Sequence, residues 1–382
     1  MGRNKYKLII ITFTVFFIIL MFSTVYGIKN ENLGNVKISN ENITIVNNDN
    51  APKFLGDIRP YDYSPLFHQE KGLEGEKNTI ETKDGNQNYS FNTEYFLPMY
   101  WKNNAPWNNC QSIVINGDYM YVLVSNPPNE GFIVRYDLKI LNKHKINKSG
   151  KNIDNLRKLG VKIANKSKLT KKEKELKKAI KVGPVFETGH GQSLSYNPKT
   201  KTLWMWQDSI PYTNKLKLME INMDKLDVKS IYKFSAKLNN TNIKGINNLA
   251  FDNEGNFYFD KKNKLPSKAD RIFTGKISDN GIDIKLIAII KQHPGMFAQS
   301  LTINPVSNQM YLVSDGAFYT LPLDKLKAGN LNKSDLKYSI FDTKREFEGI
   351  GFDNNGTEYL LTLRGSEVLK STSKVIKIDK FS

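Results

Sequence analysis

The stretch Gly191-Gln192-Ser193-Leu194-Ser195-Tyr196-Asn197 carries the pattern that decides the fold of this chain. In this pattern a polar residue is followed by a small one, then by apolar residues at alternate positions as in a β-strand, and the last residue is Asn. Each copy of the pattern continues through a turn into a second strand. Four further imperfect copies occupy residues 110–116, 246–252, 298–304 and 347–353. Repeats built of short strands are typical of propeller blades.

The polar residues that open the copies are Gln111, Gln192, Asn247, Gln299 and Glu348. They are 81, 55, 52 and 49 positions apart, and an insertion lengthens the first interval. The last copy has a candidate third strand at 374–378 and lacks a fourth, whereas a spare strand at 95–100 precedes the first copy. Closing a ring with that N-terminal strand would remove free sheet edges. The sequence therefore predicts an all-β fold, a five-bladed β-propeller, over residues 91–382.

The N-terminus of the 382-residue chain has the pattern of a targeting segment. A positively charged start precedes uncharged, largely apolar residues from Leu8 to Val25, and residues 1–27 are expected to be a signal peptide or an uncleaved membrane anchor. Either alternative places the rest of the protein outside the cytoplasm, secreted or at the outer face of the membrane. Residues 28–90 are polar and are expected to form a flexible stalk with some docked pieces. Cys110 is the single cysteine, lies in a predicted strand and is expected to be buried.

Most of the net charge of +18 lies in one segment. Between Lys139 and Lys181 there are 16 Lys or Arg and 3 Asp or Glu. The apolar spacing in this segment, and a capping-box pattern at Thr170 and Glu173, predict a small basic helical insertion at residues 142–183. Two interpretations stay open: a helical hairpin with solvated lysines, or a contact with an anionic surface polymer or membrane headgroups. The insertion has no aromatic residue on which a base could stack, so nucleic acid is not an expected partner.

The opening polar residues are also the best signal for a site. Because the first strand of a blade lines the axis of a propeller, the five of them would form a ring at one channel mouth. Such a ring could bind sugar hydroxyls, or it could satisfy backbone groups between blades. The histidines in Gly189-His190-Gly191 and His293-Pro294-Gly295 would stand at equivalent loops beside the ring. The sequence holds four histidines without a metal-binding spacing, so no metal and no cofactor are expected.

Carboxylates suggest a second kind of site. Glu346 and Glu348 share one face of a strand, and with Asp208 or Asp315 they could form a glycosidase pair, since such enzymes use two carboxyl groups. Ion pairing with Lys344 or Arg345 is the structural alternative. No catalytic residue is assigned from the sequence.

Residues 181–199, followed by Leu203-Trp204-Met205-Trp206, resemble secreted proteins of the helveticin J family of bacteriocin-like proteins of lactobacilli and their relatives. Residues 345–353 and 367–370 resemble the same family. The resemblance implies a secreted propeller of a Gram-positive bacterium with antimicrobial activity on related bacteria. It implies no catalytic residues.

The hypothesis from the sequence is thus a secreted, bacteriocin-like, non-enzymatic propeller. It would bind bacterial cell envelopes, with a glycan or an anionic surface polymer as partner, and would inhibit growth of related bacteria. The alternatives are a glycoside-acting enzyme and a cell-surface adhesin or carbohydrate-binding protein. The membrane would be a partner through the N-terminal segment alone, if that segment stays uncleaved.

Overall fold

The computed structural model describes residues 28–48, 51, 54–64, 77–101, 107–148, 152–262, 269–278 and 281–373. The expected signal peptide or anchor at 1–27 lies outside these residues. Among the helices in the described ranges, none has the length and apolarity that crossing a membrane requires.

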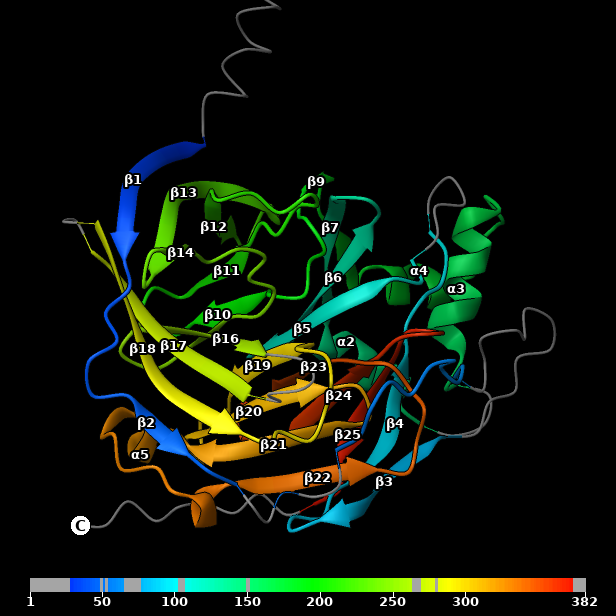
Figure 1. Ribbon diagram of the computed structural model, residues 1–382. Coiled ribbons are helices and arrows are strands. Elements are labelled where there is room, and N and C mark those ends of the chain that lie inside the picture. Colours follow the sequence, from blue (N-terminus) through cyan, green and yellow to red (C-terminus); the bar gives the residue numbers. More distant parts are fainter. Residues whose placement is uncertain are drawn as a thin grey trace, which may run out of the picture.

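The chain is mostly β-structure, and each motif copy supplies the first strand of a run of four antiparallel strands (Figure 1). The first run is β5 (Cys110–Asn116), β6 (Tyr119–Asn126), β7 (Glu130–Asp137) and β8 (Ile180–Val182), with β9 (Phe186–Glu187) also paired to β7. The second is β10 (Ser195–Asn197), β11 (Thr202–Trp206), β12 (Leu216–Asn222) and β13 (Asp227–Leu238), to which β14 (Thr241–Asn242) adds. The third is β15 (Ala250–Phe251), β16 (Phe257–Lys262), β17 (Ala269–Ser278) and β18 (Gly281–Lys291).

The fourth run is β19 (Ser300–Ile303), β20 (Gln309–Ser314), β21 (Ala317–Pro322) and β22 (Lys337–Phe341). Helix α5 (Leu323–Lys327) and the short 3-10 helix η2 (Lys333–Asp335) lie between its last two strands. The fifth run is β23 (Phe347–Phe352), β24 (Glu358–Thr362), β25 (Glu367–Ser371) and β4 (Ser90–Phe96).

The motif strands lie against one another in a closed cycle. Strand β5 contacts β10, β10 contacts β15, β15 contacts β19, β19 contacts β23, and β23 returns to β5. All five also line one narrow central cavity of about 200 Å³, to which Val114, Leu194, Ala250, Leu301 and Ile350 contribute. The sheets therefore surround a common axis, in an arrangement of the propeller type, with the motif strands innermost.

An N-terminal strand completes the last run, as predicted, but at a slightly different place. The strand is β4, which pairs antiparallel with β25, so that Phe91 lies opposite Ser371. The third strand of this run is β25 and not residues 374–378, which lie outside the described residues. The reason is a tight turn between β24 and β25, in which Arg364 and Gly365 adopt φ of 59° and 96°. This turn returns the chain before residue 374 is reached.

The expectation of a flexible stalk at 28–90 is corrected in the described part of that segment. Strand β1 (Lys29–Lys37) pairs in parallel with β13, and β2 (Thr44–Val46) pairs in parallel with β18. Strand β3 (Thr79–Gly85) pairs with both β22 and β4, and thereby joins the fourth and fifth runs into one sheet of nine strands. Main-chain hydrogen bonds hold these strands in place, so their sequences can be polar. Few of their apolar side chains, such as Val36 and Ile80, are buried.

The basic insertion is helical, as predicted, and its helices are α2 (Leu138–Lys143), α3 (Asn155–Ala164) and α4 (Lys171–Lys177). Thr170 and Glu173 form the capping box at the start of α4. Leu156 and Leu176 are buried against the core of the first run. The insertion ends earlier than residue 183, because β8 is the fourth strand of that run. Cys110 is buried in the same core, and burial raises the pKa of its thiol to about 12.

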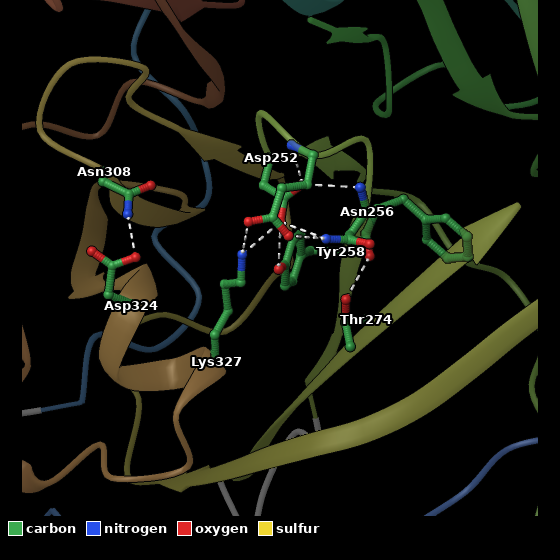
Figure 2. Close-up of polar contacts among 9 residues, drawn as sticks. Asp252, Asn256, Tyr258, Thr274, Asn308, Asp324 and Lys327 are labelled. Atoms are coloured by element: carbon green, nitrogen blue, oxygen red, sulfur yellow. Dashed lines mark hydrogen bonds and ion pairs between the residues drawn. The ribbon is translucent and has the colours of Figure 1, made fainter. Parts of the chain in front are cut away.

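In four of the five copies the residue that closes the motif holds the turn to the next strand, as Figure 2 shows for Asp252. Asp252 accepts hydrogen bonds from the backbone N–H groups of Glu254 and Asn256, each at 2.9 Å, and from the Tyr258 hydroxyl at 3.0 Å. Lys327 of α5 forms an ion pair with the same carboxylate at 3.4 Å, which ties the third run to the fourth. The closing residues of three other copies accept backbone hydrogen bonds in their own turns: Asn197, Asn304 and Asp353. An acceptor at this position is therefore a turn requirement.

Candidate functional site

A polar cavity of about 390 Å³ lies at the end of the motif strands where the opening residues stand. We call it the axial recess. Of the predicted ring, it is lined by Gln192, Asn247, Gln299 and Glu348, and His190 also reaches it. Each of these five comes from the loop or strand that begins a motif copy, so the repeat itself gathers them.

The ring side chains form one hydrogen-bonded chain. The Asn247 amide donates to Gln192 Oε1 at 2.9 Å and to the Ala298 carbonyl at 2.7 Å. The Gln192 amide in turn donates to Gln299 Oε1 and, at 3.4 Å, to Glu348 Oε2. Gln192 thus links its own motif copy to three others. The link fixes which amide atoms remain to face a ligand in the recess.

Two predicted members do not reach the axial recess. The Gln111 amide donates to Asn109 Oδ1 at 3.1 Å instead. The backbone of Gly191 packs next to the Gln111 side chain, and its carbonyl accepts from the Ser112 hydroxyl at 2.9 Å, so the loop of the second copy lies against the start of the first motif strand. His293 is 1% exposed, lies edge-on to Phe54 and does not line the recess.

The His190 loop is built around a buried carboxylate. Asp208 Oδ1 accepts from the backbone N–H of His190 at 2.7 Å and of Gly191 at 3.3 Å. Gly189 adopts a φ of 67°, and a Cβ there would lie 2.5 Å from the backbone nitrogen of Asp208. The loop therefore requires glycine at this position. Burial raises the pKa of Asp208 to about 6 and lowers that of His190 from its ordinary value, so His190 is neutral at pH 7.

Part of the recess was not foreseen from the sequence. Arg59 and Tyr61 come from the N-terminal segment, and the Tyr61 hydroxyl donates to Asp315 Oδ2 at 2.7 Å. The other oxygen of Asp315 accepts from the Gln299 amide at 2.7 Å. The sequence already indicates Asp315 as a candidate partner of the two glutamates, and it follows Gln299 by the same number of positions as Asp208 follows Gln192. No repeat signals Arg59 and Tyr61.

Two glutamates give the recess its acid–base character. Glu346 and Glu348 both line it, although the strand predicted to carry both begins at Phe347, so that Glu346 lies just before it. Burial raises the pKa of Glu346 to about 6, although Arg364 pairs with it at 2.9 Å. Burial, together with the charges of Glu346 and Asp315, raises the pKa of Glu348 well above its ordinary value. Arg345 does not pair with either glutamate of the recess but with Glu367.

Two lysines, Lys261 and Lys262, also line the recess. Lys261 donates to the Gly245 carbonyl at 2.6 Å, and burial lowers its pKa. Lys262 donates to Ser314 Oγ at 2.6 Å. Within the described ranges, no three His, Cys, Asp or Glu side chains are grouped so that they could hold a metal ion. The arrangement offers amide, hydroxyl, carboxyl and ammonium groups around one cavity, which suits hydrogen bonding to a polar ligand.

No family model matches the sequence, and no curated protein matches it. The chain is similar to a glucose dehydrogenase structure at 11% identity and a TM-score of 0.37, over 80% of this chain and 95% of that one. It is also similar to a luciferin-regenerating enzyme (11% identity, TM-score 0.38, 78% and 97% covered) and to a streptogramin B lyase (10%, 0.33, 71% and 96%). At these scores the similarities bring no activity to this chain.

Proposed function

We propose that this protein is a five-bladed propeller that binds a hydroxyl-rich ligand, a glycan, in the axial recess and does not catalyse a reaction of that ligand. The observation that carries the proposal is the convergence of Gln192, Asn247, Gln299 and Glu348, from four motif copies, on one cavity of about 390 Å³. The closed cycle of five motif strands supports the blade count. Ligand pockets of comparable size typically combine a few placed polar groups with a preformed wall.

Side-chain amides suit such a ligand because each offers both donors and an acceptor, as each sugar hydroxyl does. The hydrogen bonds among Gln192, Asn247 and Gln299 hold these amides in place before a ligand arrives. Preorganised groups lose less conformational entropy on binding. Tyr61 and Arg59, from the N-terminal segment, add a hydroxyl and a cation at the edge of the recess.

We place the ligand on the bacterial envelope, outside the cytoplasm. The charged and apolar N-terminus, the resemblance to the helveticin J family and the lysines of the insertion support this. In α4, Lys171, Lys172 and Lys174 are exposed and leave positive charge toward solvent. Each such lysine would strengthen the binding free energy to an anionic envelope polymer by roughly 1 kcal/mol, the magnitude found for anionic lipid surfaces. Growth inhibition of related bacteria belongs to the same proposal.

The test is binding of purified residues 28–382 to related bacteria and to their isolated envelope glycans. Asn247→Ala should weaken glycan binding about tenfold, because it removes one amide and frees its neighbour in the chain. Asn355→Ala is the matched control, since Asn355 is exposed on a turn away from the residues that line the recess. Equal affinities of the two variants and the unchanged protein would refute recognition in the recess.

The role of the insertion is tested separately by charge reversal. Changing Lys171, Lys172 and Lys174 to Glu should weaken binding to whole cells at low salt and have little effect at high salt. The control variant has the same net charge as this triple variant, because three exposed lysines elsewhere are changed to Glu. These are Lys201, Lys225 and Lys333. Identical binding of the two triple variants would show that the insertion has no special role. Counting surviving colonies in the same samples separates an inhibitor from an adhesin.

A second candidate function is glycoside hydrolysis, which the raised pKa of Glu346 favours. A carboxyl group with a pKa of about 6 is suited to proton transfer near neutral pH, and Glu348 beside it could serve as the second carboxyl. Release of reducing ends from envelope polysaccharide that disappears in Glu346→Gln would support the enzyme. The absence of release from a broad polysaccharide panel would leave binding as the function.

A further inference from the structure

A second cavity, of about 270 Å³, adjoins the axial recess. We call it the side cavity. Its main wall is the loop between β11 and β12, and further walls come from the turn before β7 and from β9. In the described part of the chain, Tyr212 and Gly245 are the two residues that line both this cavity and the axial recess. The two cavities therefore meet at this pair of residues.

Tyr212 presents one face of its ring at this junction. A Cβ on Gly245 would lie 2.9–3.0 Å from three neighbouring ring atoms, a spacing that arises over the face of a ring and not at its edge. Gly245 has a φ of 58°, so glycine both suits this backbone and leaves room for the ring. Lys261 donates to the Gly245 carbonyl at 2.6 Å and holds the backbone under the ring. Because Tyr212 is nevertheless 48% exposed, the opposite face of its ring is open to an incoming group.

The loop that carries Tyr212 is held in place by side chains from other segments. The Asn129 side chain accepts from the backbone N–H of Ile210 at 2.7 Å and donates to the Ile210 carbonyl at 2.8 Å. At the start of the loop, Asp208 accepts from the backbone N–H of His190, which ties the loop to a wall of the axial recess. The ring of Tyr212 is therefore in position before a ligand arrives, which limits the entropy lost on binding.

We propose, on the basis of the function proposed for the axial recess, that its ligand is an oligosaccharide of at least two linked units. One unit lies in the recess and the next in the side cavity, so that the ligand crosses Tyr212. The C–H face of a sugar ring packs on the open face of the tyrosine, whose ring is both rigid and largely apolar. In the side cavity, Glu187 and Lys215 are exposed among the lining residues and exchange hydrogen bonds with sugar hydroxyls. A monosaccharide would fill one of the two cavities and leave the other empty.

Size fractions of the envelope glycan test this. Isolated glycan from related bacteria is partially hydrolysed, separated into fractions of one to four sugar units, and titrated into residues 28–382 in a calorimeter. The affinity should rise about tenfold once the fraction is long enough to cross Tyr212, the size expected for one aromatic contact. Tyr212→Ala should remove this gain, whereas Tyr212→Phe should keep it because the ring makes the contact. Tyr63→Ala is the matched control, since Tyr63 is 49% exposed and lines neither cavity.

Asn247→Ala separates this inference from the function on which it rests, because it should weaken the binding of every fraction alike. If Asn247→Ala does so, but Tyr212→Ala keeps the gain with length or the unchanged protein shows no such gain, the oligosaccharide is overturned and the recess remains a glycan site. If no fraction binds, or if Asn247→Ala binds every fraction like the unchanged protein, recognition in the recess fails and this inference fails with it. Thermal unfolding shows whether each variant is folded. If Tyr212→Ala does not fold, the length dependence of the unchanged protein and of Tyr212→Phe decides.

Discussion

Glu367 is the point where three distant parts of the chain meet, and its neutralisation should destabilise the fold strongly. Its side chain is fully buried on β25, where Oε2 accepts from Arg345 Nη1 at 2.8 Å. The other oxygen accepts from the hydroxyl of Thr93, on the N-terminal strand β4. Arg157 of the insertion is also close, since its Nη2 donates to the carbonyl of the adjacent Ser366 at 3.3 Å. Burial lowers the pKa of Arg157 to about 10, and the Glu367 charge opposes that lowering.

Glu367→Gln keeps the shape of the side chain and removes the charge that compensates the buried guanidinium groups of Arg345 and Arg157. Arg345 would keep its bonds to Thr362 Oγ1 at 2.6 Å and to the Leu363 carbonyl at 3.1 Å, so its desolvation would be relieved in part. Breaking a buried ion pair by removing one partner costs about 3–5 kcal/mol. We expect the free energy of unfolding to fall by about that amount, a large share of the about 5–15 kcal/mol typical of folded domains.

Urea unfolding followed by tryptophan fluorescence measures this loss. A double-mutant cycle with Arg345→Met and Glu367→Gln isolates the pair, and the double variant should lose less than the sum of the two single variants. The matched control is Asp342→Asn, which breaks the exposed pair of Asp342 with Lys83 at 3.2 Å and should cost at most about 1 kcal/mol. A loss below about 1 kcal/mol for Glu367→Gln would contradict the assignment of Glu367 as the compensating charge.

Three further predictions concern single residues. Burial raises the pKa of Asp208 to about 6 from an ordinary 3.8. The protonated carboxyl therefore contributes its full stability below about pH 4, and this contribution is lost as pH rises through 6. In urea titrations at several pH values, Asp208→Asn should remove ~3 kcal/mol of this pH dependence. Asp252→Ala should lower the free energy of unfolding by about 1–3 kcal/mol, since it leaves the turn N–H groups and Lys327 without their acceptor, and an equal melting temperature would contradict this. Thr170→Ala should cost about 1 kcal/mol by removing the cap of α4, visible as a lower urea midpoint with an unchanged slope.

The strands of the ring were predictable because each copy repeats both its apolar alternation and its closing acceptor. Asp252 shows why the acceptor recurs: the backbone N–H groups of the turn need it, independently of any function of the blade. The capping box at Thr170 was predictable for the same reason, since its chemistry is local. Features fixed by residues close together in the chain are therefore readable from the sequence.

The features that the sequence did not reveal depend on contacts between distant segments. Strands β1 and β2 attach to β13 and β18 through main-chain hydrogen bonds, which leave no apolar pattern in their own residues. The repeat places Gln111 in the ring, but its amide bonds to Asn109 next to the loop around Gly191, and a repeat pattern carries no information about a neighbouring loop. Tyr61 enters the axial recess from outside the repeats altogether.

The pairing of β4 with β25 also sets the order in which this chain can fold. Phe91 leaves the ribosome long before its partner Ser371 is made. Strands β1 and β2 likewise meet partners that are synthesised long after them. Contacts between such distant residues form late, because the entropy of closing a long loop opposes them. Each of these N-terminal strands therefore docks only after its partner strand has been made, so closure of the fifth run by β4 is a late step of folding.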